Sequence, residues 1–140
     1  MTTKKFILSV LAGFIGFSVT AFLLEQLIFK NYMEKAFYQP TGIPVVPATN
    51  LPILTFAIPL SIALIMAYIY PKGYEGGSPV VEGLRFGVLL GLFSGIPYGV
   101  YFAITYAIGF GPVLAQILFY ALEVAAAGLL IGLVYGRMHE

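Results

Sequence analysis

The sequence has 140 residues, of which 60% are hydrophobic and 9% are charged, with a formal net charge of +1 and a mean hydropathy of +0.96. Because soluble domains carry about 25% charged residues, this composition excludes a soluble globular protein and indicates one integral membrane domain covering residues 1–140. No basic run suggests a nucleic-acid partner. The chain has no cysteine and its single histidine is His139, so we expect no disulfide, metal centre or other cofactor.

The first transmembrane helix is predicted over residues 6–29, after the short basic leader MTTKK. A signal peptide is the competing interpretation, with a poor cleavage site at residues 19–21. The apolar stretch is too long for a signal peptide, so we favour a membrane helix. Ala12, Gly16 and Thr20 form a row of small residues spaced by four, which is typical of a helix-packing face.

The longest predicted connection covers residues 30–50. Its first half, residues 30–38, is predicted to be a short amphipathic helix lying at the membrane interface. Its second half contains Pro40, Pro44 and Pro47 and is predicted to be extended and irregular.

Three further helices follow this connection. The second is predicted over residues 51–70, with a bend at Pro59. The third is predicted over residues 79–108, with Ser78 as its N-cap and a proline at its first position. The fourth is predicted over residues 112–136. Together the segments predict an all-α protein, an integral membrane four-helix bundle.

Basic residues are distributed unequally between the two ends of this bundle. One end holds only Lys30 and Lys35, and the other holds five basic residues: Lys4, Lys5, Lys72, Arg85 and Arg137. Cytoplasmic loops of membrane proteins carry an excess of Lys and Arg. We therefore predict an inner-membrane protein with both termini cytoplasmic and the 30–50 connection outside.

Small residues recur at every fourth position of the third helix, and a second row follows in the fourth helix. An interior glycine costs a soluble helix about 1 kcal/mol relative to alanine, whereas in a bilayer small residues let two helix backbones approach closely. The rows predict glycine-zipper packing. The partner helix belongs either to the same chain or to a second copy in a homo-oligomer. The two rows are Gly83, Gly87, Gly91, Gly95, Gly99, Ala103 and Ala107, and Gly128, Gly132 and Gly136.

Polar residues inside the predicted helices are the candidates for function. Glu123 is expected near the bilayer midplane, where ionisable groups usually face the interior of a bundle. A column of polar residues from the outer surface to the midplane is predicted. Three interpretations stay open: a neutral, hydrogen-bonded structural carboxyl group, a proton or cation site, and a contact with a partner subunit. The column consists of Glu25, Gln116, Tyr101, Tyr98 and Glu123.

No catalytic constellation is visible in the sequence. Ser94 lies between Gly91 and Gly95, in a pattern that superficially resembles a serine-hydrolase turn, but those glycines belong to the packing row and no intramembrane histidine can act as a base. Glu82 and Arg85 are predicted to pair one helical turn apart, at the depth of the lipid headgroups.

The segments EGLRFGVLLG at residues 82–91 and GLLIGLVYGR at residues 128–137 resemble small four-helix bacterial membrane proteins of unknown function. The resemblance covers mainly the second helical hairpin, and it implies a fold without an activity. Small multidrug transporters also have four helices and a glutamate in helix one. This chain departs from them, because Glu25 lies far along its helix and the chain has no tryptophan.

From these features we expect a non-enzymatic membrane protein that acts through helix packing, as an oligomer or an accessory subunit of a membrane complex. The alternative is a small transporter or channel for protons, cations or a small amphiphile that uses Glu123 and Glu25.

Overall fold

The computed structural model describes residues 2–38, 42 and 52–137. This part of the chain is helical and contains no strand, which confirms the all-α class. Four of its helices are long and apolar enough to span a membrane, as a multi-pass membrane protein requires. These four candidate spans are Thr3–Ile28, Thr55–Gly73, Pro79–Tyr106 and Phe110–Arg137.

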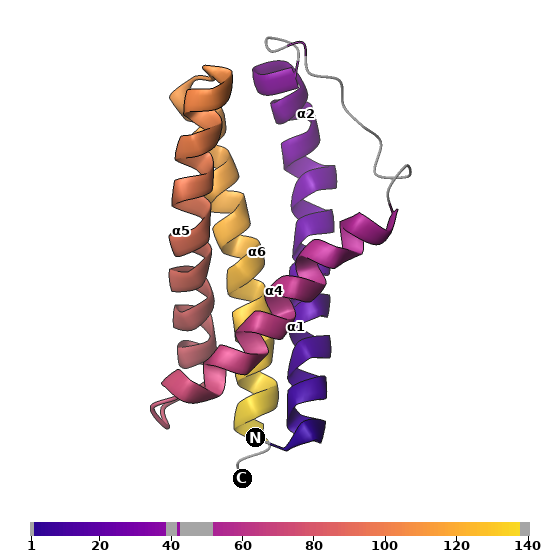
Figure 1. The fold of residues 1–140 in the computed structure, drawn as a ribbon, viewed down its shortest axis with the longest axis vertical. Helices are drawn as coiled ribbons and strands as arrows, with labels where there is room; N and C mark the ends of the chain where they lie inside the picture. Colours follow the sequence, from indigo (N-terminus) through magenta and orange to yellow (C-terminus); the bar gives the residue numbers. More distant parts are fainter. Residues whose placement is uncertain (1, 39–41, 43–51, 138–140) are drawn as a thin grey trace.

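The first helix is longer than predicted. α1 (Thr3–Leu24) continues without a break into the π-helical turn η1 (Glu25–Phe29), then α2 (Lys30–Met33) and a second π-helical turn, η2 (Glu34–Tyr38). Figure 1 shows the four segments as one rod. Residues 30–38 therefore extend the first helix instead of forming a separate interfacial helix. No glycine or proline interrupts the chain between residues 17 and 38, so nothing in this stretch stops the helix. The proline-containing half of the connection lies outside the described residues.

The other helices are α4 (Pro52–Gly73), α5 (Pro79–Tyr106) and α6 (Phe110–Arg137). Their bounds differ from the predicted 51–70, 79–108 and 112–136 by a few residues. α5 ends early because Ala107 adopts the left-handed conformation, with φ 51° and ψ 36°, which an α-helix cannot continue. Helices α4 and α5 run on through their internal prolines, Pro59 and Pro97.

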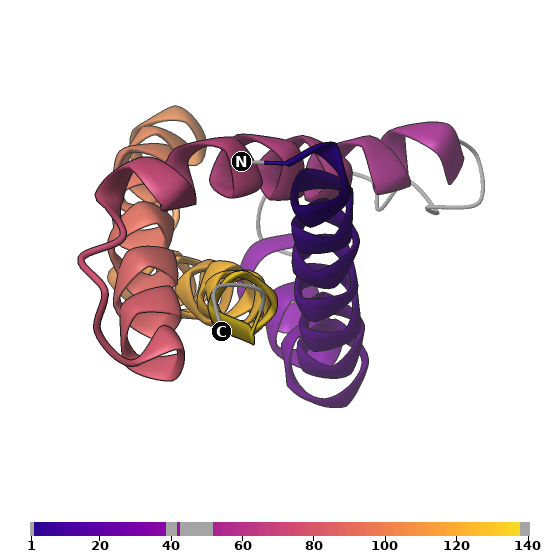
Figure 2. The same cartoon turned by 90° about the horizontal axis from the view of Figure 1, so that it is seen from below.

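α6 is the central helix of the molecule. It lies between α5 and α1 and packs along both, whereas α4 packs mainly on α1 and contacts α6 less. Figures 1 and 2 show that α4 crosses one face of the α5–α6–α1 layer obliquely. This arrangement differs from an up-and-down bundle, in which all four helices would lie nearly antiparallel.

The glycine row of α5 faces α6 of the same chain. A methyl group on Gly83 would lie 2.5 Å from the carbonyl oxygen of Gly128, and one on Gly91 would lie 2.8 Å from the Cα atom of Ala121. These distances leave no room for a side chain, so the two backbones are in direct contact. The five glycines of the row are all buried: Gly83, Gly87, Gly91, Gly95 and Gly99.

A second close contact joins α1 to α6. A methyl group on Gly16 would lie 2.8 Å from the carbonyl oxygen of Ala126. The buried small residues of α1 are Ser9, Gly13 and Gly16, whereas Ala12 and Thr20 are only half-buried. Only Gly16 belongs to both the predicted row and the observed contact face. The observed face includes Gly13, the neighbour of the predicted Ala12. Helix α6 thus presents backbone to both of its neighbours.

The interior between these helices is apolar. Met66, Val124 and Ile131 are fully buried and pack with a cluster that includes residues of α1, α4 and α6. Many large apolar side chains point outward, as Phe22 and Leu27 do. Such an exposed apolar surface is expected where a protein meets lipid.

Four helix ends lie together at one end of the molecule. α1 and α5 begin there, and α4 and α6 end there (Figure 1). Five basic residues belong to these four ends: Lys4, Lys5, Lys72, Arg85 and Arg137.

Candidate intramembrane carboxyl site

Glu123 lies on the part of α6 that passes α1. The two helices are antiparallel, because Gly16 of α1 meets Ala126 and Gly13 meets Ile131. Continuing this register one turn along places Glu123 at the level of Thr20 on α1. The side chain of Glu123 is half-buried, and it belongs to the candidate span Phe110–Arg137.

Glu25 lies where α1 changes to the π-helical turn η1. The residue is exposed at the surface of the protein and falls inside the candidate span Thr3–Ile28. The antiparallel register of α1 and α6, continued to residue 25, places Glu25 at the level of residues 117–119, between Gln116 and Glu123 along α6. Short π-helical turns within α-helices occur frequently at functional sites. Two carboxyl groups from two helices thus lie within the candidate membrane spans, about one to two helical turns apart along the α1–α6 contact.

Gln116 precedes Glu123 by two turns of α6, on the same side of the helix. Its Oε1 atom is buried and accepts no hydrogen bond from the residues that the structure describes. A buried acceptor without a partner costs about 1–3 kcal/mol. Gln116 therefore adds an unsatisfied oxygen to the α1–α6 side of the molecule.

Tyr98 and Tyr101 do not join these three residues. Both are exposed on α5, at 53% and 62% of their surface, and the ring of Tyr98 packs 5.5 Å from that of Phe102. The buried face of α5 is its glycine row, and successive residues turn by about 100° around a helix. Tyr98 and Tyr101 are therefore rotated away from α6, and the predicted polar column is not assembled as a whole.

Glu25, Gln116 and Glu123 all carry oxygen acceptors. Within the described part of the chain, neither the Glu25 nor the Glu123 carboxyl group forms a hydrogen bond or an ion pair. Carboxyl oxygens can hold a proton or a hard cation. Among the described residues, no group of three or more His, Cys, Asp or Glu side chains gathers to hold a metal ion.

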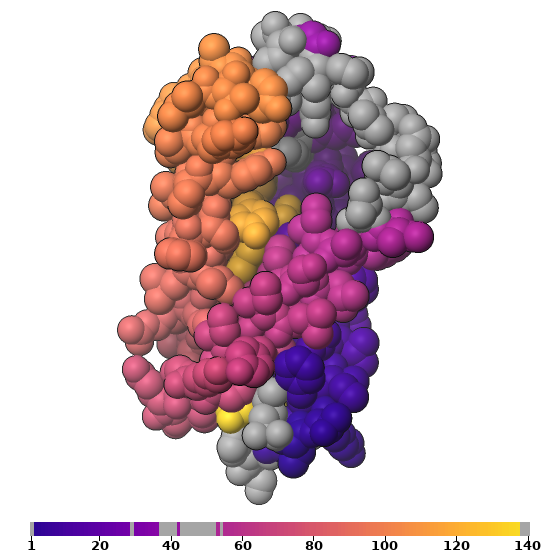
Figure 3. Space-filling view, in the orientation of Figure 1, coloured from indigo at the N-terminus to yellow at the C-terminus, as the bar shows by residue number. Residues whose placement is uncertain are grey.

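The face of the molecule around α4 is hollowed. Figure 3 shows α6 at the bottom of an opening between α5 and the oblique α4. The opening arises because α4 lies near α5 only at the lower end of the molecule and diverges from it above that end (Figures 1 and 2).

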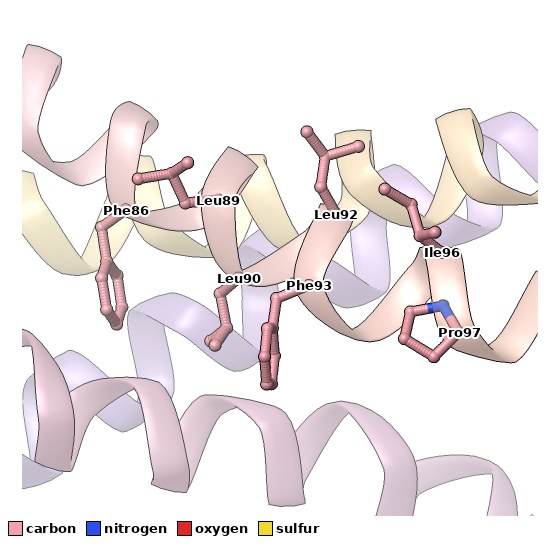
Figure 4. Close-up of a pocket in the computed structure, with 7 residues that line it drawn as sticks. All are labelled: Phe86, Leu89, Leu90, Leu92, Phe93, Ile96 and Pro97. Atoms are coloured by element: carbon pink, nitrogen blue, oxygen red, sulfur yellow. The ribbon is translucent and has the colours of Figure 1, made fainter.

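An apolar groove runs along the surface of α5. Its volume is about 600 Å³. Figure 4 shows Phe86, Leu90 and Phe93 extending toward α4, while Leu89 and Leu92 leave α5 on another side. The side chain of Phe93 is 78% exposed, so other helices cover little of this surface. The groove is lined by Phe86, Leu89, Leu90, Leu92, Phe93, Ile96 and Pro97.

A smaller cavity of about 170 Å³ lies at the start of α5. Much of its lining is apolar, and we call it the polar cavity because the charged residues Glu75, Glu82 and Arg85 belong to it. Here the Glu82 carboxylate accepts hydrogen bonds from the backbone N–H groups of Glu75, at 3.1 Å, and Gly77. The described residues hold no ion pair between Glu82 and Arg85, so the predicted pairing is wrong. Ser78 occupies the N-cap position, but its side chain forms no capping hydrogen bond.

A cluster of aromatic rings stands beside this cavity. The Tyr70 ring lies 5.5 Å from the rings of both Phe86 and Tyr135, and Tyr74 lies 5.2 Å from Tyr135. Lys5 adds a cation over the ring of Tyr135. The cluster was not predicted, because its members come from three successive helices and the α4–α5 connection, and their contact depends on how these helices pack.

Comparisons of the chain with protein-family profiles, with curated proteins and with solved structures found no match.

Proposed function

We propose that this chain is a non-enzymatic, multi-pass membrane protein that binds a proton or a cation between η1 and α6, as a small transporter or channel. One observation carries the proposal. Glu25 and Glu123 come from two helical segments that run side by side where α1 packs on α6, and both residues lie within candidate membrane spans.

The chemistry of the pair supports a binding role. Ionisable side chains are rare within membrane spans, and they commonly mark ion pathways and proton relays. Two neighbouring carboxyl groups repel each other when both are ionised, and a shared proton or cation relieves that repulsion. The buried, unpartnered Oε1 atom of Gln116 offers a further oxygen on the same side of α6.

The distribution of charge supports an orientation for the pathway. The basic ends of α1, α4, α5 and α6 would face the cytoplasm under the positive-inside rule, in the inner membrane of the cell. Glu25 then belongs to the outer half of the membrane and Glu123 to its middle. A proton or cation would enter past Glu25 and reach Glu123.

Transport assays on vesicles test this proposal. The purified protein is reconstituted into liposomes that contain a pH-sensitive dye, and a potassium gradient with valinomycin drives the flux. We expect a proton flux in the unchanged protein and its loss in Glu123→Gln, because the amide keeps the shape of the side chain but cannot titrate.

Glu34→Gln is the matched control, since Glu34 is an exposed acidic residue beyond the candidate span Thr3–Ile28. It should leave the flux unchanged. Gel filtration should give the same profile for all variants. Absence of proton flux in the unchanged protein, or equal flux in Glu123→Gln, would refute proton transport through Glu123.

A second candidate function is that of an oligomer or an accessory subunit of a membrane complex. The oblique course of α4 favours it. Because α5 packs mainly along α6, α4 leaves an apolar surface of α5 exposed, and another chain could cover that surface. The glycine rows would serve as an internal zipper between α5 and α6, so the intermolecular contact would use another surface. Mass measurement after purification in a mild detergent tests this function. A monomer without a co-purifying partner would contradict it.

A further inference from the structure

The apolar groove and the polar cavity on α5 form one path. Phe86 and Leu89 line both of them. The polar cavity is lined by residues from the end of α4, the connection and the start of α5. Figure 4 shows the groove residues following one another along α5 from Phe86 to Pro97. A ligand in this path would have a polar head at the helix end and an apolar tail along the helix.

The length of the groove matches one leaflet of a bilayer. Phe86 and Pro97 mark its two ends, and a helix rises about 1.5 Å per residue, which gives a length of about 16 Å. The hydrocarbon core of a bilayer is about 30 Å thick, so one acyl chain spans about half of that distance. The groove thus fits one acyl chain of a lipid whose headgroup lies at the polar cavity.

The charges around the polar cavity indicate the headgroup. Arg85, Glu75 and Glu82 line the cavity. The Glu82 carboxylate is occupied by two backbone N–H groups of the preceding turn, which leaves one guanidinium and one further carboxylate. Within the described residues Arg85 forms no ion pair. A guanidinium recognises phosphate well, and a carboxylate recognises an ammonium group.

We infer that α5 binds a single phospholipid with a primary-amine headgroup. The phosphate lies at Arg85, the ammonium group lies at Glu75, and one acyl chain lies along the groove from Phe86 to Pro97. This inference goes beyond the proposed transport function and does not depend on it.

Native mass spectrometry tests the inference. The protein is reconstituted into nanodiscs that contain equal amounts of phosphatidylethanolamine and phosphatidylcholine, then released and weighed. We expect one retained phosphatidylethanolamine per chain. Arg85→Gln removes the charged contact to phosphate, so it should lower the retained fraction about tenfold. Leu89→Trp should lower it similarly, because Leu89 lies where the cavity and the groove meet.

Two matched variants separate this site from the general lipid surface. Lys72→Gln removes a basic residue from the same end of the molecule, and Leu122→Trp enlarges a comparably exposed leucine on α6. Both should keep the bound lipid. Circular dichroism checks that all four variants remain helical.

Three results would overturn the inference. The first is equal retention of the two phospholipids, which would exclude recognition of the primary amine. The second is equal loss of lipid in the site and control variants, which would indicate solvation by bulk lipid only. The third is a doubled mass, or the mass of an additional protein, in place of bound lipid, which would assign the groove to a helix. A positive flux assay with no retained lipid would leave the transport function standing while rejecting this site.

Discussion

Glu82 illustrates what a single side chain does in this structure. Its carboxylate accepts the N–H groups of Glu75 and Gly77, and its own N–H donates to the carbonyl oxygen of Ser78, at 2.9 Å. These bonds fold the connection between α4 and α5 onto the first turn of α5. Because the acceptor carries a charge, each bond is stronger than one between neutral groups.

Loss of this carboxylate should loosen the connection. We expect Glu82→Ala to increase hydrogen exchange at the amides of Glu75 and Gly77 about tenfold, since removing a hydrogen bond of about 1.4 kcal/mol changes the open population by that factor. Hydrogen–deuterium exchange with mass spectrometry of the peptide covering residues 74–78 measures the change. Glu75→Gln, which alters an exposed side chain, should leave the exchange as it is. Unchanged exchange in Glu82→Ala would contradict the role of the carboxylate.

At the scale of single residues, sequence indicates the position along a helix better than the direction around it. The sequence places Glu123 near the middle of the last helix, and α6 (Phe110–Arg137) extends about equally far on both sides of it. The direction of Tyr98 and Tyr101 depends on which face of α5 meets α6. That face is set by the glycine row, and both tyrosines are turned away from it. Residues at equal depth need not meet.

Among the elements, the α5–α6 hairpin is the one whose packing is most sensitive to added volume. At Gly91 the nearest atom to an added methyl group would be the backbone Cα of Ala121, at 2.8 Å, whereas at Gly95 it would be a ring carbon of Tyr120, at 3.2 Å. A side chain can move aside more easily than a helix backbone. The glycines of one row are therefore not equivalent.

This difference predicts the order of three alanine variants. Gly91→Ala should destabilise the protein by about 2 kcal/mol or more, because overpacking forces the backbones apart. Gly95→Ala should be milder, and Gly109→Ala should be close to neutral, since nothing lies within 4 Å of the added methyl group. Unfolding in SDS–detergent mixtures, followed by circular dichroism, measures the series. Equal stability of Gly91→Ala and Gly109→Ala would show that the row is not a contact surface.

Sequence also indicates where elements begin better than where they end. The proline at the start of α5 stands at the first helical position, where its missing N–H is tolerated. The end of the first helix was placed at residue 29 from apolar composition alone, whereas the helical path continues to Tyr38. Charged residues mark the end of an apolar span, but they do not end the helix itself where no glycine or proline interrupts it.

At the scale of the whole molecule, the arrangement of the ends makes a topological prediction. Ser78 precedes α5 and Gly109 precedes α6, and both are exposed. Under the proposed orientation, residue 78 faces the cytoplasm and residue 109 faces outward. Since the chain has no cysteine, single-cysteine variants report each position separately.

A membrane-impermeant maleimide applied to intact spheroplasts tests this topology. It should label Gly109→Cys at once and Ser78→Cys only after lysis. The reverse order would invert the proposed orientation, and labelling of both variants before lysis would contradict a membrane span between the two residues.

The oblique course of α4 was not predictable from the sequence. Apolar residues surround this helix on all sides, so no stripe marks the face that packs. Its buried residues, such as Ala63, Met66 and Ala67, are apolar, and so are most of its exposed ones, such as Leu64 and Ile65. The α5–α6 contact was easier to predict from the sequence, because a row of glycines marks a packing face and a row of leucines does not.

The central position of α6 has a consequence for how the protein is made. α6 leaves the ribosome after α1, α4 and α5, and at typical elongation rates the delay after α1 is on the order of ten seconds. During that time the glycine faces of α1 and α5 have no backbone to contact and lie against lipid or against the insertion machinery. Assembly of the layer is therefore a late event, timed by the synthesis of its last helix. A ribosome that stalls before α6 would release three apolar helices without the one that holds two of them together.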